Sequence, residues 1–275
     1  MIEMPEAVTL AAQLHDTVRG SRVADVEVNH SPHKWAWFHG DPLTYADRLI
    51  GLSVKKATSN GGFVTLDLGP RRLVYAEGVS IRYHADDSTL PKNHQLLVTF
   101  EGGASLCASV QMYGALYCWD ANDVDNTYYL QACDKPSPLL DDFNESYFLD
   151  LAAAEDLQRK SAKALLATEQ RVPGLGNGVL QDILLAAGIH PKRKVASMSA
   201  AERRRLFRAV RRTLAEMVRR GGRDTEKDLF GQVGGYQTKL SRKTVGSACA
   251  KCGSAVEKAS YLGGSVYFCA TCQPL

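Results

Sequence analysis

The sequence has no long apolar run, no basic segment at its amino terminus and no internal repeat. A membrane-spanning helix needs about 18 or more consecutive apolar residues, and no run in this chain approaches that length. The first residues, MIEMPEAVTLAAQL, carry acidic side chains where a secretory signal would carry positive charge. We therefore expect a cytoplasmic, monomeric protein without membrane contact.

The cysteines are odd in number, which argues against a disulfide framework. The chain has seven, and cytoplasmic proteins rarely keep disulfides. Three of the cysteines, Cys107, Cys118 and Cys133, are scattered through an apparent β-region. We expect these three to be buried and to pack as small apolar side chains. The other four lie within residues 249–275.

Charge is unevenly distributed, although the net charge is only +3. Between Lys192 and Arg223, twelve Lys and Arg residues stand against two acids. Such a run attracts a polyanion such as nucleic acid, or it forms the solvated face of a helix. The composition leaves both interpretations open.

The pattern of residues 1–132 predicts an amino-terminal domain made mainly of strands. An amphipathic helix is expected from Ala7 to Val18, where the apolar residues recur at helical spacing. Short β-branched or aromatic segments follow, separated by glycine, aspartate and proline turns, as in a sandwich or barrel. The clearest of these segments are 63–68, 73–75, 95–100 and 115–119.

The remaining residues predict a linker, a helical domain and a small appendage. Residues 133–145 contain two prolines and no periodicity, as expected of a linker. Residues 146–240 follow a helical pattern, and 241–275 form the appendage. Helices are expected at 146–167, 177–187 and 199–220, the last beginning at a capping box made by Ser199 and Glu202.

Two CxxC pairs in the appendage predict a structural zinc site. Cys249 and Cys252 form the first pair, and Cys269 and Cys272 form the second. Zn²⁺ favours four thiolates in a tetrahedron, and four cysteines leave no open position for catalysis. A segment this small cannot build a core of its own, so the metal should hold the finger together. The alternatives are free thiols or redox pairs.

A glycine-rich loop, 173–177, joins two of the expected helices. Glycines permit close backbone approach, and the N–H groups that begin the next helix can bind an anion such as phosphate. A plain helix–helix turn is the alternative.

This loop and the segments on both sides of it resemble a known protein family. The segments Leu165–Asn177 and Ala186–Pro191 resemble the helix–two-turn–helix segment of the formamidopyrimidine-DNA glycosylase / endonuclease VIII family. The finger with its closing Cys272-Gln273 and the opening Glu3–Glu6 are similar to the same family. The resemblance spans the chain and implies an α+β protein with an amino-terminal helix and β-sandwich, a helix–two-turn–helix domain and a four-cysteine zinc finger.

The resemblance also implies a ligand and the residues that contact it. The family grips damaged double-stranded DNA between its domains, so a nucleoid-associated location is expected. Lys163 and Asn177 match positions that contact backbone phosphate, and Gly176 belongs to the same loop. Such contacts position a protein on DNA without reading its sequence.

The family's catalytic amine position differs in this chain. Family members attack the sugar C1′ with the amine of a proline exposed by removal of Met1, and a neighbouring glutamate assists. Here these positions are Ile2 and Glu3. Isoleucine is bulkier than the residues that usually permit removal of the initiator methionine, and a retained Met1 would displace the amine by about 3.8 Å. The chain is therefore identified as a divergent member lacking the catalytic proline.

Three further family positions lack their usual side chains. The assisting lysine falls at Gly61-Gly62, the segment that inserts an arginine corresponds to 109–114, and the arginine of the finger turn falls at Gly264. Met112 and Tyr113 could serve as an apolar wedge, but packing in the core is favoured for them.

Residues 31–41 mix basic and aromatic side chains. They could stack on bases, but a hairpin with half-buried tryptophans is the favoured interpretation.

These features predict a base-excision DNA glycosylase, with or without AP-lyase activity, whose catalysis is altered by Ile2. Glu3 would activate water, or an unusual terminal amine would act with it. A catalytically inactive DNA- or lesion-binding protein on the same fold is the alternative. Binding of structured RNA through the basic helix and the finger also stays open.

Overall fold

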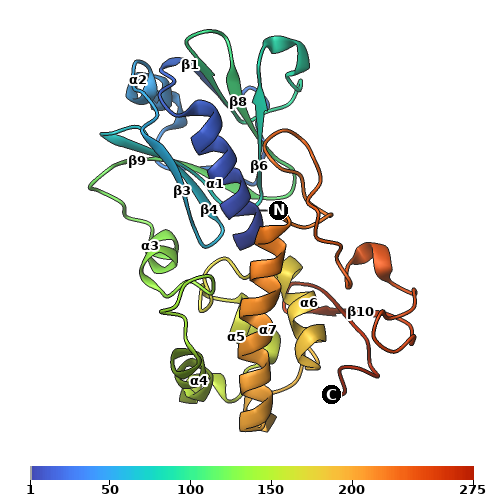
Figure 1. Ribbon diagram of the computed structural model, residues 1–275. Coiled ribbons are helices and arrows are strands. Elements are labelled where there is room, and N and C mark those ends of the chain that lie inside the picture. The colour runs from blue at the N-terminus through green and yellow to red at the C-terminus, as the bar shows by residue number, and fades with distance from the viewer. Residues whose placement is uncertain (1) are drawn as a thin grey trace.

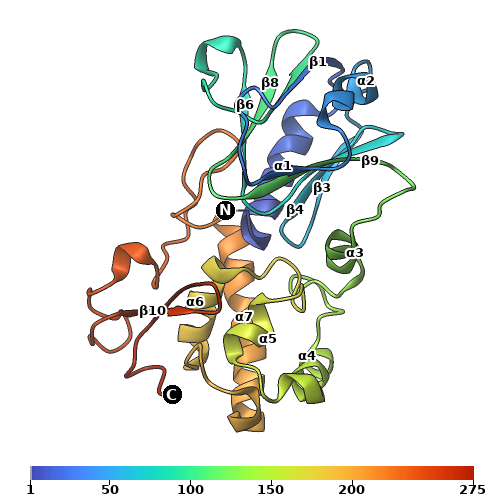
Figure 2. The ribbon, with the colours of Figure 1, turned by 180° about the vertical axis from the view of Figure 1, so that it is seen from behind.

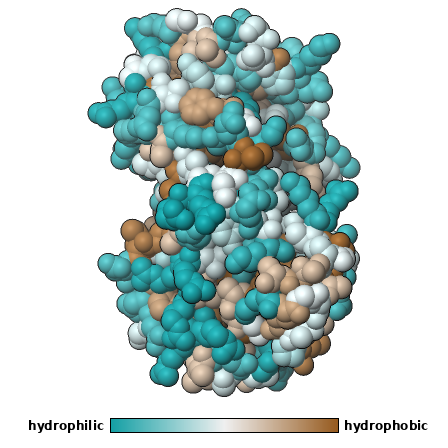
Figure 3. All heavy atoms as spheres, turned by 45° about the vertical axis from the view of Figure 1, so that its right-hand side comes forward, coloured by the Kyte–Doolittle hydropathy of each residue, from teal (hydrophilic) through white to brown (hydrophobic). Residues whose placement is uncertain are grey.

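Two lobes joined at a waist are visible in the computed structural model, which describes residues 2–275 (Figures 1 and 2). The amino-terminal helix, the strands of residues 23–120 and the short helix at residues 45–49 form one lobe, and the helices from residue 145 onward form the other with the carboxyl-terminal hairpin. The space-filling view shows the waist and a mostly hydrophilic face with scattered apolar residues (Figure 3). The predicted α+β architecture is confirmed.

The first lobe is a sandwich of a four-stranded and a five-stranded sheet. Their strand orders are β1-β7-β8-β6 and β2-β9-β5-β4-β3. Neighbouring strands are antiparallel except β2, which runs parallel to β9. The strands are β1 (Val23–Val28), β2 (Ala36–Phe38), β3 (Lys56–Asn60), β4 (Phe63–Asp67), β5 (Arg71–Tyr75), β6 (Val79–His84), β7 (Leu96–Phe100), β8 (Ser105–Val110) and β9 (Gly114–Asp120).

Helix α1 (Met4–Val18) packs one face into the core of this sandwich. Leu10, Leu14 and Val18 are buried there with apolar residues of both sheets. The helix begins three residues before the expected Ala7, because Glu3 and Glu6 form a capping box at its start and Pro5 lies in its first turn. A short helix, α2 (Tyr45–Leu49), precedes β3.

The second lobe is built from helices whose apolar faces meet in a core separate from that of the sandwich. Helix α6 (Asn177–Ala187) spans the residues expected of it. Helix α7 (Ala200–Arg219) begins at the predicted capping box of Ser199 and Glu202. The other helices of this lobe are α4 (Glu145–Ala153) and α5 (Ala162–Ala167). Helix α3 (Thr127–Asp134) instead buries Tyr129 and Ala132 in a cluster with Phe63 of the sandwich.

The single helix expected at 146–167 is wrong, because α4 and α5 are separate helices. The Gln158 side chain donates hydrogen bonds to the Ala152 and Ala154 carbonyl oxygens at the end of α4. Ser161 then caps the start of α5 by accepting a hydrogen bond from Ala164 N. The structure also has α3, which the sequence did not indicate. The proposed limits of the domains stay a prediction.

The carboxyl-terminal hairpin consists of β10 (Glu257–Tyr261) and β11 (Gly264–Phe268) and lies beside α6. Leu262 and Gly263 connect the strands, and both have positive φ angles, of 47° and 72°. A tight two-residue hairpin turn of this hand requires that conformation at both positions. Gly264 is therefore the first residue of β11 rather than part of the turn.

Two local expectations are wrong. Cys107 and Cys118 are buried as expected, but Cys133 is exposed in the last turn of α3. Residues 31–41 do not form a hairpin, because their strand β2 pairs in parallel with the distant β9. Among the described residues, no helix combines the length and apolar character needed to cross a membrane.

Candidate active site in the interdomain cleft

A cavity of about 570 Å³ lies between the two lobes, within the range of roughly 300–1,000 Å³ typical of ligand sites. We call it the interdomain cleft. Its lining comes from the sandwich, the helical lobe and the finger: Ile2, Glu3, Gly62, Phe63, Glu77, Met112, Tyr113, Tyr128, Lys163, Leu166, Ala167, Thr168, Gln170, Val172, Gly174, Leu175, Gly176, Asn177, Leu262, Gly263, Gly264, Ser265 and Tyr267.

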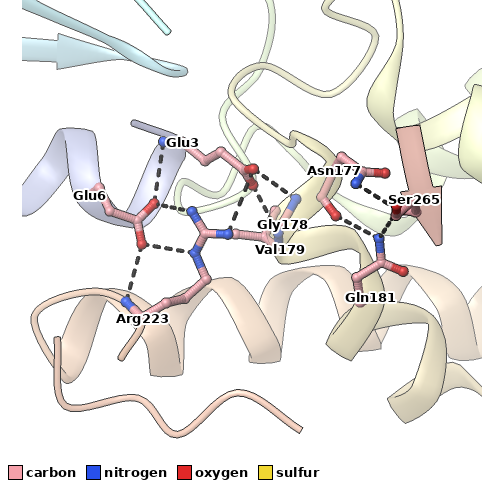
Figure 4. A network of polar contacts seen from close by, with 8 residues as sticks. All are labelled: Glu3, Glu6, Asn177, Gly178, Val179, Gln181, Arg223 and Ser265. Atoms are coloured by element: carbon pink, nitrogen blue, oxygen red, sulfur yellow. Dashed lines mark hydrogen bonds and ion pairs between the residues drawn. The ribbon is translucent and has the colours of Figure 1, made fainter. Parts of the chain in front are cut away.

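Glu3 brings a buried carboxylate to the wall of this cleft (Figure 4). Its Oε1 accepts a hydrogen bond of 2.7 Å from Gly178 N, and its Oε2 accepts one of 2.8 Å from Val179 N. These are N–H groups of the first turn of α6, where the helix dipole favours a negative charge. Arg223 Nη1 lies 3.6 Å from Glu3 Oε1.

Arg223 is buried and shared between two glutamates. Its Nε and Nη2 donate to Glu6 at 2.9 and 2.8 Å, so Glu6 holds it more closely than Glu3 does. Burial would raise the pKa of Glu6, but the charge and hydrogen bonds of Arg223 hold it below its usual value. Burial raises the pKa of Glu3, and Arg223 only partly opposes this effect. A carboxyl with a raised pKa in a cleft is suited to proton transfer.

The sequence predicted a binding site for an anion such as phosphate at the N-terminus of α6, but in the structure the Glu3 carboxylate accepts the hydrogen bonds of the Gly178 and Val179 N–H groups there. Gly176 is the residue before α6, and a Cβ on it would lie 2.6 Å from Glu3 Cδ. Only glycine allows so close an approach. A phosphate contact by Gly176 stays a prediction. The close packing of Glu3 is a second reason why this position is a glycine.

Lys163 and Asn177 lie together in the cleft, as expected of two residues with one ligand. Lys163 Nζ donates to Tyr261 O at 2.7 Å, and Asn177 Nδ2 donates to Ser265 O at 2.9 Å. Both side chains thus hold the backbone of the finger hairpin (Figure 4 shows Asn177). Partial burial lowers the pKa of Lys163. Their predicted role in binding phosphate is compatible with these contacts, because an ammonium has three N–H donors and a carboxamide has two.

Ile2 also lines the cleft, while its side chain is buried in the sandwich core. Opposite it, the turn between β3 and β4 meets the glycine-rich loop backbone to backbone. A Cβ on Gly61, which has φ +55°, would lie 2.9 Å from Gly174 N. The turn therefore has no room at Gly61 for the lysine that the family resemblance places near it.

Two apolar residues and the arginines of α7 differ in their relation to the cleft. Met112 and Tyr113 are not core residues: they are 68% and 37% exposed and line the cleft. Of the described residues that line the cleft, none belongs to α7. Its arginines include Arg204 and Arg211, which pair with acids of neighbouring segments. The part of the basic run on α7 therefore does not line the cleft, whereas Arg223, at the end of the run, is buried beside Glu3.

Glu77 is a second carboxyl in the cleft, which the sequence analysis missed. It lies between β5 and β6, where one glutamate in a connecting segment carries no recognisable signal. Burial, together with the charge of Glu3, raises the pKa of Glu77 to about 7. Only the folded chain brings the two carboxyls near each other.

Glu77 should make the stability of the chain depend on pH. The Glu77 carboxyl holds its proton more tightly in the folded chain than in the unfolded chain. Its contribution to the free energy of unfolding is therefore fully present below about pH 4.5 and is lost as the pH rises through about 7. In Glu77→Gln this dependence should disappear, which makes the variant more stable than the parent at pH 8 by roughly 1–2 kcal/mol. Urea unfolding at pH 4.5 and at pH 8 measures the effect.

Glu101→Gln is the matched control, because Glu101 is exposed on the same lobe. It should leave the pH profile of stability unchanged. If the stability of the parent and of Glu77→Gln depended on pH in the same way, Glu77 would not be the source of the predicted pH dependence.

The four cysteines of the finger converge as the sequence predicted. Their sulfur atoms all lie within 4.8 Å of one another. The Cys249 and Cys272 sulfurs are 4.0 Å apart, and those of Cys252 and Cys269 are 3.5 Å apart. A zinc ion with Zn–S bonds of about 2.3 Å places tetrahedral sulfurs about 3.8 Å apart. The cluster therefore fits a closed, structural zinc site.

A β-sandwich, a helical lobe with a glycine-rich loop and a four-cysteine finger around one cleft define a two-domain protein with an interdomain site. The model of the formamidopyrimidine-DNA glycosylase N-terminal domain matches residues 1–127, and that of the formamidopyrimidine-DNA glycosylase H2TH domain matches residues 135–228. Together they span most of the chain. The protein belongs to the formamidopyrimidine-DNA glycosylase family.

Individual relatives match along nearly the whole length. The formamidopyrimidine-DNA glycosylase of Geobacillus kaustophilus is 28% identical, over 99% of this chain and 100% of the relative. That of Symbiobacterium thermophilum is 29% identical, over 100% and 90%. The Lactococcus lactis Fpg, solved with DNA containing an abasic site, has the same fold, with a TM-score of 0.85 at 22% identity over 99% of this chain and 100% of that chain.

Proposed function

We propose that this protein is a base-excision DNA glycosylase that binds damaged double-stranded DNA across the interdomain cleft. The observation that carries the proposal is the buried Glu3 carboxyl on the wall of a cavity between the sandwich, the helical lobe and the finger. The names of the full-length relatives support the reaction class. The Lactococcus lactis relative, solved with DNA that contains FAPY-dG, supports the class of ligand.

The proposed reaction is hydrolysis, with Glu3 as the general base. Water attacks C1′ of the damaged nucleotide, its proton passes to the Glu3 carboxylate, and the C1′–N bond breaks as the base leaves with the electron pair. The proton then passes from Glu3 to the departing base. The N–H groups of Gly178 and Val179 and the Arg223 guanidinium stabilise the ionised form that accepts the proton.

Ile2 is the reason for proposing water rather than the chain's own amine as nucleophile. Amine catalysis requires removal of Met1, which a bulky second residue disfavours, and a misplacement of 1 Å can reduce a rate about a hundredfold. The mass of the purified protein's amino terminus, together with borohydride trapping on abasic DNA, separates the two chemistries. A trapped adduct would assign the reaction to the amine of Ile2 and add AP-lyase activity.

For binding, we propose that Lys163, Gly176 and Asn177 contact backbone phosphate. Tyr261 O takes one of the three N–H donors of Lys163, and Ser265 O takes one of the two on Asn177. The remaining N–H donors of Lys163 and Asn177 would bind phosphate, and the hydrogen bonds to the finger would hold both side chains in place for this contact. Zn²⁺ would hold the finger itself through Cys249, Cys252, Cys269 and Cys272, with a structural role only.

Glu3→Gln should abolish excision while it leaves DNA affinity nearly unchanged. Loss of a general base typically reduces a rate by about 10²–10⁴-fold. The assay is release of bases from duplexes that carry oxidised purines or oxidised pyrimidines. Glu6→Gln is the matched control, since it disturbs the same Arg223 contact but does not line the cleft. Undiminished excision by Glu3→Gln, or no excision by the parent on the whole panel, would refute the enzymatic proposal.

The second candidate is a DNA- or lesion-binding protein without catalysis. It is favoured by the contacts of Glu3, which already join α1 to α6 and to Arg223 and so give this residue a structural purpose. Tight binding to an abasic analogue, with neither base release nor a trapped adduct, would support this candidate.

A further inference from the structure

Three aromatic side chains form an exposed row on the sandwich lobe. We call Trp35, Trp37 and Tyr113 the aromatic row. They are 49%, 47% and 37% exposed. The rings of Trp35 and Trp37 have centroids 6.1 Å apart, and those of Trp37 and Tyr113 are 6.4 Å apart. The row is therefore continuous from one ring to the next.

The row begins in the interdomain cleft and leads out of it. Tyr113 lines the cleft, while Trp35 and Trp37 lie beyond the cleft lining. The backbone fixes this arrangement, because Trp37 pairs with Ala115 in the parallel ladder of β2 and β9. Gly114 N also donates to Trp35 O at 2.9 Å. Distant segments of the chain thus present their rings side by side.

Packing of the core does not explain the two tryptophans. Phe38, at the end of the same strand, contacts the buried Tyr45 and serves the sandwich core. Trp35 and Trp37 keep about half of their surface in solvent, which is costly for large apolar rings that have no ligand.

The row also carries a positive charge. Lys34 Nζ lies 4.9 Å from the centre of the Trp35 ring. Flat rings with an adjacent cation are the combination that binds single-stranded nucleic acid, since bases stack on the rings and the cation meets the backbone. Bases in an intact duplex are stacked on their neighbours, so only unpaired bases can offer a face to Trp35 or Trp37.

We propose that the aromatic row binds unpaired nucleotides of the DNA held in the interdomain cleft. The inference rests on the proposed function, because continuity with the cleft is what names DNA as the occupant. It deepens that function by naming a substrate class: lesions in locally unpaired segments of a DNA duplex, such as bubbles. Tyr113 is the ring nearest the damaged nucleotide, and Trp37 and Trp35 follow along the strand that leaves the cleft.

Paired Trp35→Ala and Trp37→Ala substitutions test this inference. The probes are two duplexes with the same tetrahydrofuran abasic analogue, one fully paired and one with mispaired bases on both sides of it. The parent should prefer the mispaired duplex, and the double variant should bind that duplex about tenfold or more weakly, from the loss of base stacking. Affinity for the paired duplex should change less than about twofold.

Controls separate stacking from folding and from charge. Leu43→Ala removes another exposed apolar side chain of the lobe and should have no effect. Trp35→Phe with Trp37→Phe should restore most of the preference. The preference should persist at higher salt, because stacking is not a counterion-release effect. In the parent, unpaired DNA should also quench tryptophan fluorescence.

The outcomes distinguish this inference from the function on which it rests. If the parent binds paired abasic DNA but the double alanine variant keeps the full preference for the mispaired duplex, the inference is overturned and the proposed function stands. If the parent binds neither duplex, the proposed function fails first. Quenching by single-stranded RNA and not by the matched DNA would overturn the assignment to DNA.

Discussion

Cys269→Ser should leave the chain without bound zinc and unfold residues 241–275, while the sandwich and the helices of the second lobe stay folded. The apolar cluster of the finger is small, with Leu240 and Val256 joined to Leu185 of α6 and to two of the cysteines. Binding of structural zinc contributes about 10–16 kcal/mol to folding in isolated fingers, far more than a few buried side chains at about 1.5–3 kcal/mol each. DNA binding should fall with the finger, because Lys163 and Asn177 lose the carbonyls that hold them.

Three measurements check this expectation: metal content, proteolysis confined to residues 241–275, and affinity for abasic duplex. Cys133→Ser is the matched control, since it removes an exposed cysteine outside the finger. That variant should keep one zinc per chain. If Cys269→Ser retained the metal and resisted protease, the role assigned to the four-cysteine cluster would be wrong.

Arg223→Met should destabilise the chain by about 3–5 kcal/mol, the usual effect of leaving a buried charge without its partner. Arg223 is 3% exposed and lies between two carboxylates that are equally shielded from solvent. Without the guanidinium, Glu3 and Glu6 keep only their backbone contacts, and the pKa of Glu6 loses the influence that lowers it. The free energy of unfolding in urea at neutral pH measures the effect.

The control for Arg223 lies at the end of α7. Arg219 also pairs with a glutamate, Glu216, at 2.8 Å, but its side chain is 67% exposed. Arg219→Met should therefore change stability far less than Arg223→Met does, because solvent screens an exposed ion pair. Equal losses in the two variants would show that burial does not set the strength of the Arg223 contacts. At lower pH the difference between parent and Arg223→Met should shrink, as Glu6 takes up a proton.

Features encoded by neighbouring residues were predictable from the sequence. The capping box of Ser199 and Glu202 begins α7 as expected, since its hydrogen bonds span only three residues. The four-cysteine cluster was predicted for the same reason: a CxxC pair places two thiolates within one turn. The break between α4 and α5 was missed because the bonds of Gln158 compete with a helical pattern that continues in the sequence.

The site was predictable only in part. The family resemblance pointed to Glu3, Lys163, Gly176 and Asn177, and the structure brings all four to one cleft. The resemblance gave no reason to name Glu77, whose raised pKa arises from burial near Glu3, a carboxyl far earlier in the chain. The apolar character of Met112 and Tyr113 favoured burial in the core, but both side chains are exposed on the cleft.

The sequence by itself determined the family, the architecture, the four-cysteine cluster and the absence of a proline after Met1. Each of these is read from residue types at short spacings, or from several motifs in a fixed order. Only the tertiary structure decided what those residues contact. It placed the Glu3 carboxylate at the N-terminus of α6, shared the buried Arg223 between Glu3 and Glu6, and aligned Trp37 with Tyr113. These pairings join residues far apart in the chain, and such contacts depend on strand register and lobe packing, which no local pattern specifies.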